Sequence, residues 1–273
     1  MPFTIDLAGG RALVTGGGQG IGRATAHALA EAGASVVVND VVADRAEEVA
    51  AEIRQTGGEA AAAAFDVTDR RAVRAAVDEL GGVDILVNNA GNAGTEGFGP
   101  LVPFADTDPD TWDRYLRVNL YGVMYCTHAA LPAMIARGEG RIVTVVSEAG
   151  RFGDAYLAPY AAAKAGAAGF CRSVAREVGR HGITVNCVSL GTVRTPAAAG
   201  GSTEPDQPDH PDHPDHASDA DDEATRRRLS RYVIRRPGEP ADVAAMVTYL
   251  ASPLASWITG QTYPVNGGYT LSL

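Results

Sequence analysis

The sequence predicts an α/β protein built on a parallel, doubly wound sheet with helices on both faces, folded as one domain over residues 1–273. Short apolar runs typical of buried strands alternate with helix-like segments through the first half of the chain. A glycine-rich turn directly follows the first of these runs. A length of 273 residues, with 45% hydrophobic and 21% charged residues, suits one full-sized core.

The expected strands are short and apolar, and glycines or polar residues bound them. The run SVVVN at 35–39 shows the pattern, because a strand buried on both faces needs a continuous apolar run. In chain order the expected strands are Arg11–Thr15, Ser35–Asn39, Ala60–Phe65, Val83–Val87, Arg141–Ser147, Ile183–Ser189 and Thr262–Val265.

The expected helices lie between these strands, as crossovers between parallel strands do. They are Gly20–Ala32, Asp44–Gln55, Arg70–Leu80, a long helical region over Pro109–Arg137, Tyr160–Arg180 and Pro240–Ala251. The chain has no second periodic core, so we expect a single domain.

Residues 197–224 interrupt this alternation with a segment rich in Pro, Asp and His. Nine acidic residues and no Lys or Arg lie within 201–224, so most of the net charge of −10 belongs to this insertion and the rest of the chain is nearly neutral. Neither part has the basic footprint of a nucleic-acid-binding protein. A polar loop of this length is expected to be a functional lid or a disordered segment.

Histidines recur every three residues in the insertion, at His210, His213 and His216. They raise the possibility of a metal site. In polyproline II geometry, however, residues three apart lie about 9 Å from each other. That separation is too long for neighbouring histidines to share one ion unless the chain bends. We therefore expect no bound metal, and a mobile lid that contains an expanded repeat.

The sequence carries no sign of membrane insertion or export. It has no run of 18 apolar residues, and the N-terminus lacks the basic region of a signal peptide. Cys126, Cys171 and Cys187 are far apart and lack metal-ligand spacing. We expect them to be reduced core thiols in a cytoplasmic protein.

The turn after the first strand has the sequence TGGGQGIG at 15–22. Glycines let the backbone approach a pyrophosphate, and the helix that follows directs free N–H groups at it. The glycines fall at Gly16, Gly20 and Gly22 rather than in the G-x-G-x-x-G spacing. No Lys-Ser/Thr pair follows, which excludes a P-loop. The turn predicts dinucleotide binding, and a glycine-rich turn without a ligand is the alternative.

Asp40 follows the second expected strand, 18 residues after Gly22. An acid at this place can accept hydrogen bonds from the adenosine ribose hydroxyls and would repel a 2′-phosphate. Its sequence neighbour Val41 is not basic, nor is Gln19 in the turn. The pattern favours NAD over NADP. The alternative is that Asp40 caps the next helix.

Tyr160 and Lys164 are four residues apart on an Ala-rich helix, so they face the same side. Lys164 is the only lysine among 23 basic residues, and Arg cannot replace a compact ammonium. An adjacent ammonium lowers the pKa of a tyrosine from its usual value of about 10. Ser147, at the end of a strand, can donate to a carbonyl or alkoxide oxygen. Together the three residues predict proton transfer at a carbon–oxygen bond.

These motifs together resemble the single-domain subgroup of the short-chain dehydrogenase/reductase family, and the resemblance covers essentially the whole chain. The remaining matches are DVTD at 66–69, NNAG at 88–91, RVNLYG at 117–122, YAAAK at 160–164, GTVRTP at 191–196 and GQTYPVNGG at 260–268. One departure is Leu190, where the family usually has proline before the glycine.

The resemblance implies a Rossmann-type fold and a role for each matching position. Its implied catalytic residues are Asn119, Ser147, Tyr160 and Lys164, with Tyr160 as the acid/base and Asn119 holding a water that relays protons to Lys164. Asn88 is expected to brace the sheet. The implied cofactor contacts are Gly16, Gln19, Gly20, Ile21, Gly22, Asp40, Asp66, Val67, Asn89, Ala90, Gly91, Tyr160, Lys164, Val193 and Thr195.

The implied activity is the NAD-dependent interconversion of a secondary alcohol and a ketone, by a homotetramer assembled through the long helices and the C-terminal strand. Tyr160 would take the hydroxyl proton while hydride passes to the nicotinamide. A 3-oxoacyl-thioester reductase of the same family is the close alternative. A non-catalytic dinucleotide sensor is a further one, although it would not need Ser147, Tyr160 and Lys164 together. The expected substrate loops are Asn92–Phe98, Glu148–Tyr156 and the region after Thr195, and they carry no diagnostic polar pattern.

Overall fold

A computed structural model describes residues 4–91, 101–194 and 229–271 of the chain. Three sequence-based expectations lie outside these residues. They are the lid over 197–224 with its histidine repeat, the cofactor contact of Thr195 and the substrate loop Asn92–Phe98.

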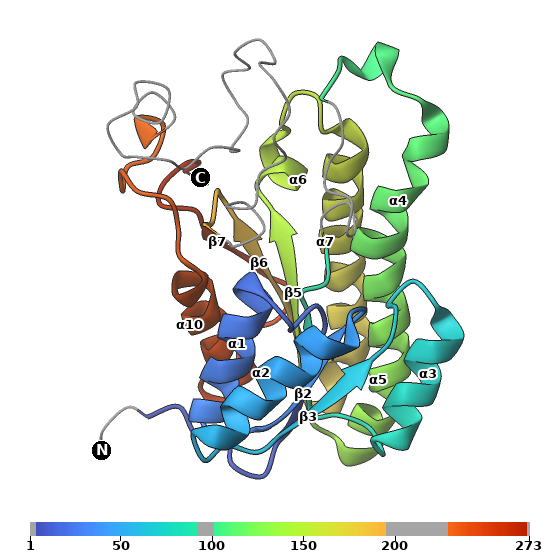
Figure 1. Cartoon of the computed structure of the whole chain (residues 1–273), viewed down its shortest axis with the longest axis vertical. Helices are drawn as coiled ribbons and strands as arrows, with labels where there is room; N and C mark the ends of the chain where they lie inside the picture. Colours follow the sequence, from blue (N-terminus) through green and yellow to red (C-terminus); the bar gives the residue numbers. More distant parts are fainter. Residues whose placement is uncertain (1–3, 92–100, 195–228, 272–273) are drawn as a thin grey trace.

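The described residues form one seven-stranded sheet in which every neighbouring pair is parallel, in the order β3-β2-β1-β4-β5-β6-β7 (Figure 1). The strands are β1 (Arg11–Val14), β2 (Ser35–Asp40), β3 (Ala60–Ala64), β4 (Ile85–Asn88), β5 (Gly140–Ser147), β6 (Ile183–Leu190) and β7 (Thr262–Val265). The predicted fold class is confirmed, and each observed strand overlaps its expected range.

Helices cover both faces of this sheet. On one face lie α1 (Gly20–Glu31), α2 (Ala43–Gln55) and α10 (Pro240–Ala251). On the other face lie α3 (Arg70–Glu79), α5 (Val123–Arg137) and α7 (Ala158–Val178). The short helices α4 (Asp113–Leu116) and α6 (Ala149–Phe152) lie toward the upper end of the molecule in Figure 1.

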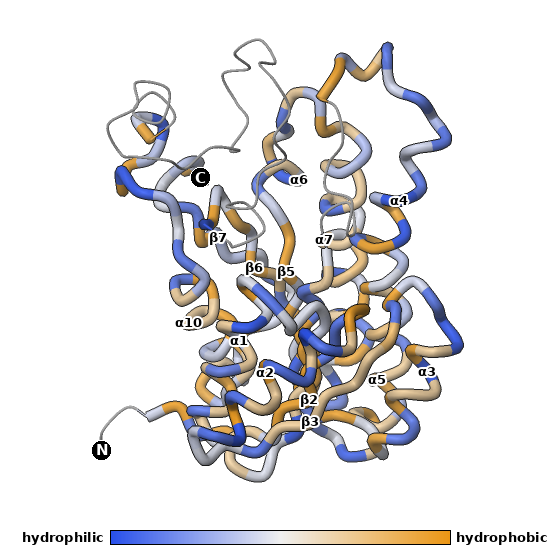
Figure 2. The backbone as a smooth tube through the Cα atoms, in the orientation of Figure 1, coloured by the Kyte–Doolittle hydropathy of each residue, from blue (hydrophilic) through white to orange (hydrophobic). Residues whose placement is uncertain are grey.

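The core consists of two apolar layers because successive strand residues point to opposite faces. On β1, Val14 packs toward α1 and α10 while Leu13 packs toward α5 and α7. Figure 2 shows apolar residues along the central strands and hydrophilic residues in many outlying turns. Cys126, Cys171 and Cys187 are free and buried, as predicted.

The helical region expected over Pro109–Arg137 is not one continuous helix. It begins with a 3-10 turn at Pro109–Thr111, followed by α4, a π-helical turn at Arg117–Gly122 and then α5. The π turn inserts an extra residue into the helical repeat, and such turns are common at functional sites. Here it contains the fully buried Asn119.

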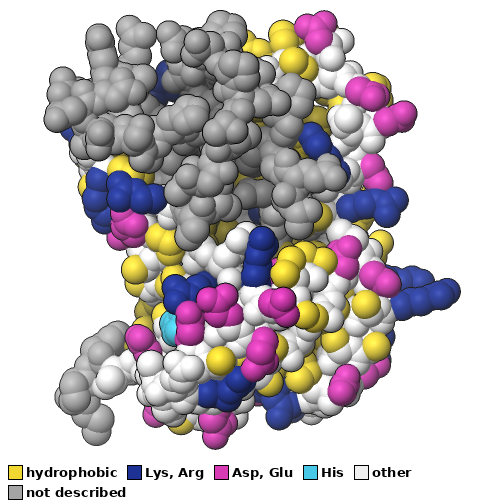
Figure 3. All heavy atoms as spheres, viewed as in Figure 1, with side chains coloured by type: hydrophobic (Ala, Val, Ile, Leu, Met, Phe, Trp, Pro, Cys, Tyr) yellow, Lys and Arg dark blue, Asp and Glu magenta, His cyan; other side chains and the backbone are white. Residues whose placement is uncertain are grey.

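The surface has no single dominant charge in the view of Figure 3, where basic and acidic side chains lie interspersed over the described part of that face. Among the described residues, no helix combines the length and apolar character needed to cross a bilayer. The same residues contain no cluster of three His, Cys, Asp or Glu side chains able to hold a metal ion.

Candidate active site

The order of the strands sets the position of the site. Successive strands are added in one direction across the sheet from β1 to β3 and in the opposite direction from β4 to β7. Ligands of open parallel sheets bind in the crevice at the carboxyl ends of the strands where this order switches, here between β1 and β4. The glycine-rich turn follows β1, and Asn89–Gly91 follow β4. The structure therefore brings these two predicted cofactor segments together.

The glycine turn is held tightly enough that side chains would not fit. Gly16 and Gly20 have φ angles of +61° and +53°, which favour glycine. A Cβ on Gly22 would lie 2.0 Å from the carbonyl oxygen of Gly16. Helix α1 begins at Gly20, and Gln19 caps it without a side-chain hydrogen bond. The first turn of α1 thus presents its backbone to the crevice, the arrangement that suits a pyrophosphate.

Thr15 and Asn89 lock the turn to β4, a role that the sequence did not reveal. The N–H groups of Asn89 and Ala90 donate to Thr15 Oγ1 at 3.0 and 3.1 Å. Asn89 Nδ2 donates to the carbonyls of Thr15 and Gly16 at 3.0 and 2.9 Å. The signal in the sequence for this role was Thr15 itself, a polar residue that directly follows the apolar run of β1.

Asp40 is buried at the end of β2 and faces the same turn. Its Oδ2 accepts from the Gly18 N–H at 3.2 Å, and its Oδ1 accepts from the Val42 N–H at 3.0 Å. Arg45 is also close, because a Cβ on Gly18 would lie 2.7 Å from both Arg45 Cβ and Asp40 Oδ2. The sequence neighbours of Asp40 gave no sign of this arginine, which the first turn of α2 brings back beside the glycine turn.

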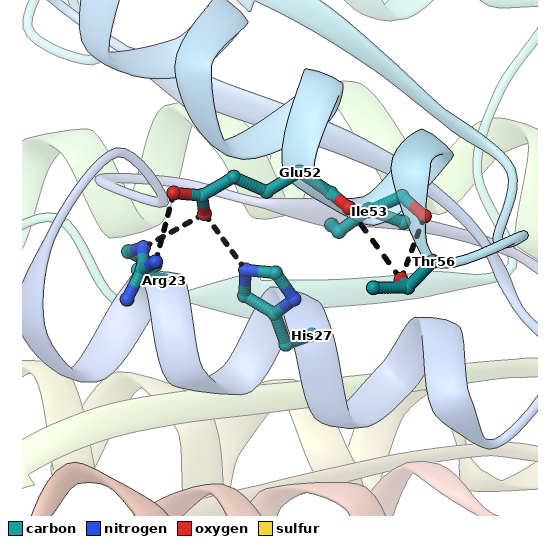
Figure 4. Close-up of polar contacts among 5 residues, drawn as sticks. All are labelled: Arg23, His27, Glu52, Ile53 and Thr56. Atoms are coloured by element: carbon teal, nitrogen blue, oxygen red, sulfur yellow. Dashed lines mark hydrogen bonds and ion pairs between the residues drawn. The ribbon is translucent and has the colours of Figure 1, made fainter.

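A cleft of about 440 Å³ opens beside the glycine turn, lined by Gly18–Gly20 and by the facing surfaces of α1 and α2. Glu52 of α2 accepts from Arg23 Nη2 and Nε at 2.8 and 2.9 Å, and His27 Nε2 lies 3.0 Å from Glu52 Oε2 (Figure 4). The hydrogen bonds from Arg23 hold the pKa of Glu52 below its usual range. This bidentate pair fixes α1, the helix that begins at the glycine turn, against α2.

Ser147 and Tyr160 come together across the ends of β5 and α7. Ser147 is the last residue of β5, and its Oγ accepts from the Ala149 N–H at 3.2 Å. It also hydrogen-bonds to Tyr160, which packs in a small buried cluster with Tyr115 and Ala149. Burial raises the pKa of Tyr160 to about 12, and the hydrogen bond with Ser147 opposes that shift.

Lys164 lies one turn after Tyr160 and is only 4% exposed. Its Nζ donates to the carbonyl of Val145 at 2.9 Å. Burial lowers the pKa of Lys164 to about 8. The expected lowering of the Tyr160 pKa by the adjacent Lys164 ammonium is therefore not found, because burial dominates the pKa values of both residues.

Asn119 and Gly91 complete this part of the crevice. A Cβ on Gly91 would lie 3.0 Å from both Asn119 Oδ1 and Lys164 Nζ, so these three residues meet at one point. Asn119 Nδ2 donates to the carbonyl of Tyr115 at 3.0 Å. Thus all four predicted catalytic residues lie around one end of the crevice.

The other predicted contacts lie along the crevice or beside it. Val67 is buried and packs close to Gly122 of the π turn, while Asp66 is exposed. Ile21 packs against the core at the start of α1, and Val193 forms a bridge with Gly238 after β6. Asn88 braces the sheet as predicted.

That brace consists of two buried hydrogen bonds. Asn88 Nδ2 donates to Thr127 Oγ1 at 3.2 Å and to Thr144 Oγ1 at 3.3 Å, linking β4 to α5 and β5.

Arg151 lies on α6, four residues after Ser147. In the structure its Nη1 donates to Glu148 Oε1 at 3.0 Å, and the Glu148 side chain is only 3% exposed. Thr270 also donates to this carboxylate. The charge of Arg151 is therefore matched by a buried partner, which ties α6 to the C-terminal segment.

The family model for short chain dehydrogenases matches residues 11–206. The chain therefore belongs to the short-chain dehydrogenase/reductase family. It is an oxidoreductase that acts on hydroxyl or keto groups and uses a nicotinamide dinucleotide, NAD or NADP.

Individual relatives agree with this assignment over nearly their full length. A cis-4-hydroxycyclohexanecarboxylate dehydrogenase of Sinomonas cyclohexanicum is 40% identical over 263 residues, which cover 95% of this chain and 96% of the relative. A gluconate 5-dehydrogenase from Burkholderia cenocepacia J2315, solved with NADP and tartrate, has a TM-score of 0.84 at 34% identity and 98% coverage of both chains. A 7α-hydroxysteroid dehydrogenase solved with NADH and 7-oxo glycochenodeoxycholic acid has a TM-score of 0.81 at 34% identity, covering 96% of this chain and 95% of the other.

Proposed function

We propose that this protein is an NAD-dependent dehydrogenase that interconverts a secondary alcohol and a ketone, with Tyr160 as the acid/base. The observation that carries the proposal is the meeting of Ser147, Tyr160 and Lys164 at the end of the crevice that begins at the glycine turn. A dinucleotide with its pyrophosphate at α1 would extend along this crevice.

The residues present fit a dinucleotide. Added side chains at Gly18 and Gly22 would collide with Asp40 and with the backbone of Gly16, so the backbone stays bare where a pyrophosphate must approach. When bound, the nicotinamide supplies the carbon that accepts or donates hydride. Asp40 supports the choice of NAD, because its carboxylate suits ribose hydroxyls and opposes a 2′-phosphate.

The protein residues handle the proton and the substrate oxygen. In oxidation the Tyr160 phenolate removes the hydroxyl proton, and in reduction its phenol returns one. Ser147 Oγ accepts from the Ala149 N–H, and its own proton can be donated toward Tyr160 or the substrate oxygen. The Lys164 ammonium stabilises the phenolate electrostatically.

Alicyclic secondary alcohols are the first substrates to test, since the Sinomonas relative at 40% identity is named for a hydroxycyclohexanecarboxylate. A panel of cyclic alcohols, sugar acids, hydroxysteroids and 3-oxoacyl thioesters is assayed with NAD(H) and NADP(H), following NAD(P)H absorbance. Turnover of a cyclic alcohol with NAD supports the proposal. Turnover restricted to thioesters would replace it with an acyl-thioester reductase.

We also propose assembly as a homotetramer through the long helices and the C-terminal strand. Tyr121 of the π turn, Met124 and Ile135 of α5, and Trp257 near β7 expose apolar surface that self-association would cover. Sedimentation velocity at micromolar concentration should give a tetramer, and a monomer would contradict this part of the proposal.

A further inference from the structure

The turn that follows β6 is held by a tyrosine that lies 40 residues further along the chain. The Tyr232 hydroxyl accepts from the Thr192 N–H at 3.0 Å and donates to Thr192 Oγ1 at 2.8 Å. Tyr232 is only 5% exposed, so both bonds are shielded from water. Shielding strengthens them and makes their loss costly.

The ring of Tyr232 also packs directly against this turn. Its Cε1 lies 3.3 Å from the position of a Cβ on Gly191, and its Cδ1 lies 3.3 Å from a Cβ on Gly267. The ring centroid is 5.1 Å from that of Tyr269. Tyr232 is thus packed between the turn after β6 and the turn after β7.

Thr192 is fixed through its carbonyl as well. The Gly238 N–H donates to the Thr192 carbonyl at 2.9 Å, and the Arg194 N–H donates to the Gly238 carbonyl at 2.8 Å. Val193, which lies between Thr192 and Arg194 in the chain, forms a β-bridge with Gly238. The backbone around Val193 is therefore clamped from both sides, by Tyr232 and by Gly238.

This turn lacks a covalent restraint that proline would provide. Leu190, the last residue of β6, stands immediately before Gly191 and lacks the ring by which a proline fixes φ near −65°. The hydrogen bond from Gly191 N–H to the Val265 carbonyl is long, at 3.4 Å. The shorter bonds of Tyr232 supply the restraint one residue further on.

We propose that Tyr232 is a positioning residue for the nicotinamide end of the cofactor site. It holds the Gly191–Val193 turn, which contains Val193, a cofactor contact implied by the family resemblance, and it does not touch the reacting atoms. The inference rests on the proposed function, because it requires that this turn contact the nicotinamide.

The test compares two ligands that differ in the nicotinamide. NADH spans the whole crevice, whereas ADP-ribose carries the adenosine, the pyrophosphate and the second ribose and lacks only the nicotinamide ring. Dissociation constants for both are measured by calorimetry on the full-length wild-type protein, on Tyr232→Phe, and on Tyr249→Phe, a control that removes a phenol hydroxyl from α10. Thermal unfolding without ligand checks that each variant is folded.

Tyr232→Phe keeps the ring and removes both hydrogen bonds to Thr192. We expect its dissociation constant for NADH to rise about tenfold, equivalent to about 1.4 kcal/mol, while that for ADP-ribose stays within twofold of wild type. The control should bind both ligands as wild type does. A second variant, Thr192→Val, removes only the side-chain bond and should weaken NADH selectively by a smaller factor.

Two results would overturn the proposed role of Tyr232, and a third would overturn the proposed function on which that role rests. Equal weakening of NADH and ADP-ribose would reduce Tyr232 to a general structural role. Unchanged NADH binding in both variants would show that the clamp is irrelevant to the cofactor. A wild-type protein that binds neither ligand would instead refute the proposed function itself.

Discussion

The Lys164 ammonium lies 5.8 Å from the centroid of the Tyr160 ring, one helical turn further along α7. Both residues are buried, and burial moves their pKa values in opposite directions, to about 12 for Tyr160 and about 8 for Lys164. Each shift disfavours the charged form of its residue. The pair is therefore held in a dry pocket, where an ammonium and a phenolate interact more strongly than in water.

The buried lysine should make stability depend on pH. The pKa of Lys164 falls from 10.5 to about 8 on folding, so between these values the unfolded chain binds more protons than the native protein. Stability contributed by Lys164 is then fully present above pH 10.5 and is lost as pH falls toward 8. From pH 8 to 9.5 the gain in unfolding free energy should reach roughly 1.5 kcal/mol.

Urea unfolding of wild type and Lys164→Met at pH 8 and 9.5 measures this gain. Tyr160 does not interfere, because its pKa rises from 10 to about 12 and its stabilisation is lost only above pH 10. The unfolding free energy of wild type should increase relative to that of Lys164→Met as the pH rises. A difference that does not change with pH would show that Lys164 is not desolvated.

The preference for NAD or NADP should depend on the opposite charges of Asp40 and Arg45 beside the glycine turn. Asp40→Ser removes the carboxylate that would repel a 2′-phosphate, and Arg45 beside the same turn can then attract one. We expect the ratio of kcat/KM for NADP over NAD to rise at least tenfold, measured by initial rates with both cofactors.

Arg45→Ala in the Asp40→Ser background provides the matched control, and it should remove most of the gain with NADP. A ratio that stays the same in Asp40→Ser would mean that Asp40 does not face the ribose.

Tyr156 should show an unusual order of substitutions. Its φ of +66° makes it the only described residue other than glycine with a positive φ, and it lies four residues before Tyr160. A side chain in this region costs roughly 1–2 kcal/mol relative to glycine. Tyr156→Gly should therefore be more stable than Tyr156→Ala by about 1 kcal/mol, the reverse of the usual order.

Thermal and urea unfolding of the two Tyr156 variants provide the check. Comparing Gly with Ala leaves the contacts of the tyrosine ring out of the result, since both variants lack it. If Tyr156→Ala proves the more stable, the left-handed conformation at this position is wrong.

Much of the fold could be predicted because parallel strands and their crossover helices leave local patterns. The run at 35–39 and the helix at 240–251 were recognisable from composition alone. The π turn at Arg117–Gly122 was not, because one extra residue barely alters the apolar periodicity of a long helix.

The site could be predicted where the spacing of two reactive residues along a helix places them on one side, as with Tyr160 and Lys164. It was not predictable where distant segments fold together. Arg45 approaches Asp40 only because α2 turns back on the glycine turn, and Tyr232 reaches Thr192 from 40 residues away. The raised pKa of Tyr160 likewise follows from burial, which no residue spacing encodes.

The most direct test of the proposed chemistry is the turnover of Tyr160→Phe with the best substrate of the panel, together with its affinity for NADH. The substitution keeps the ring packed against Tyr115 and Ala149 and removes only the hydroxyl that exchanges the proton. Turnover should fall by about 10²–10⁴-fold, with the NADH dissociation constant within about twofold of wild type. Turnover like that of wild type in this variant would show that Tyr160 is not the acid/base.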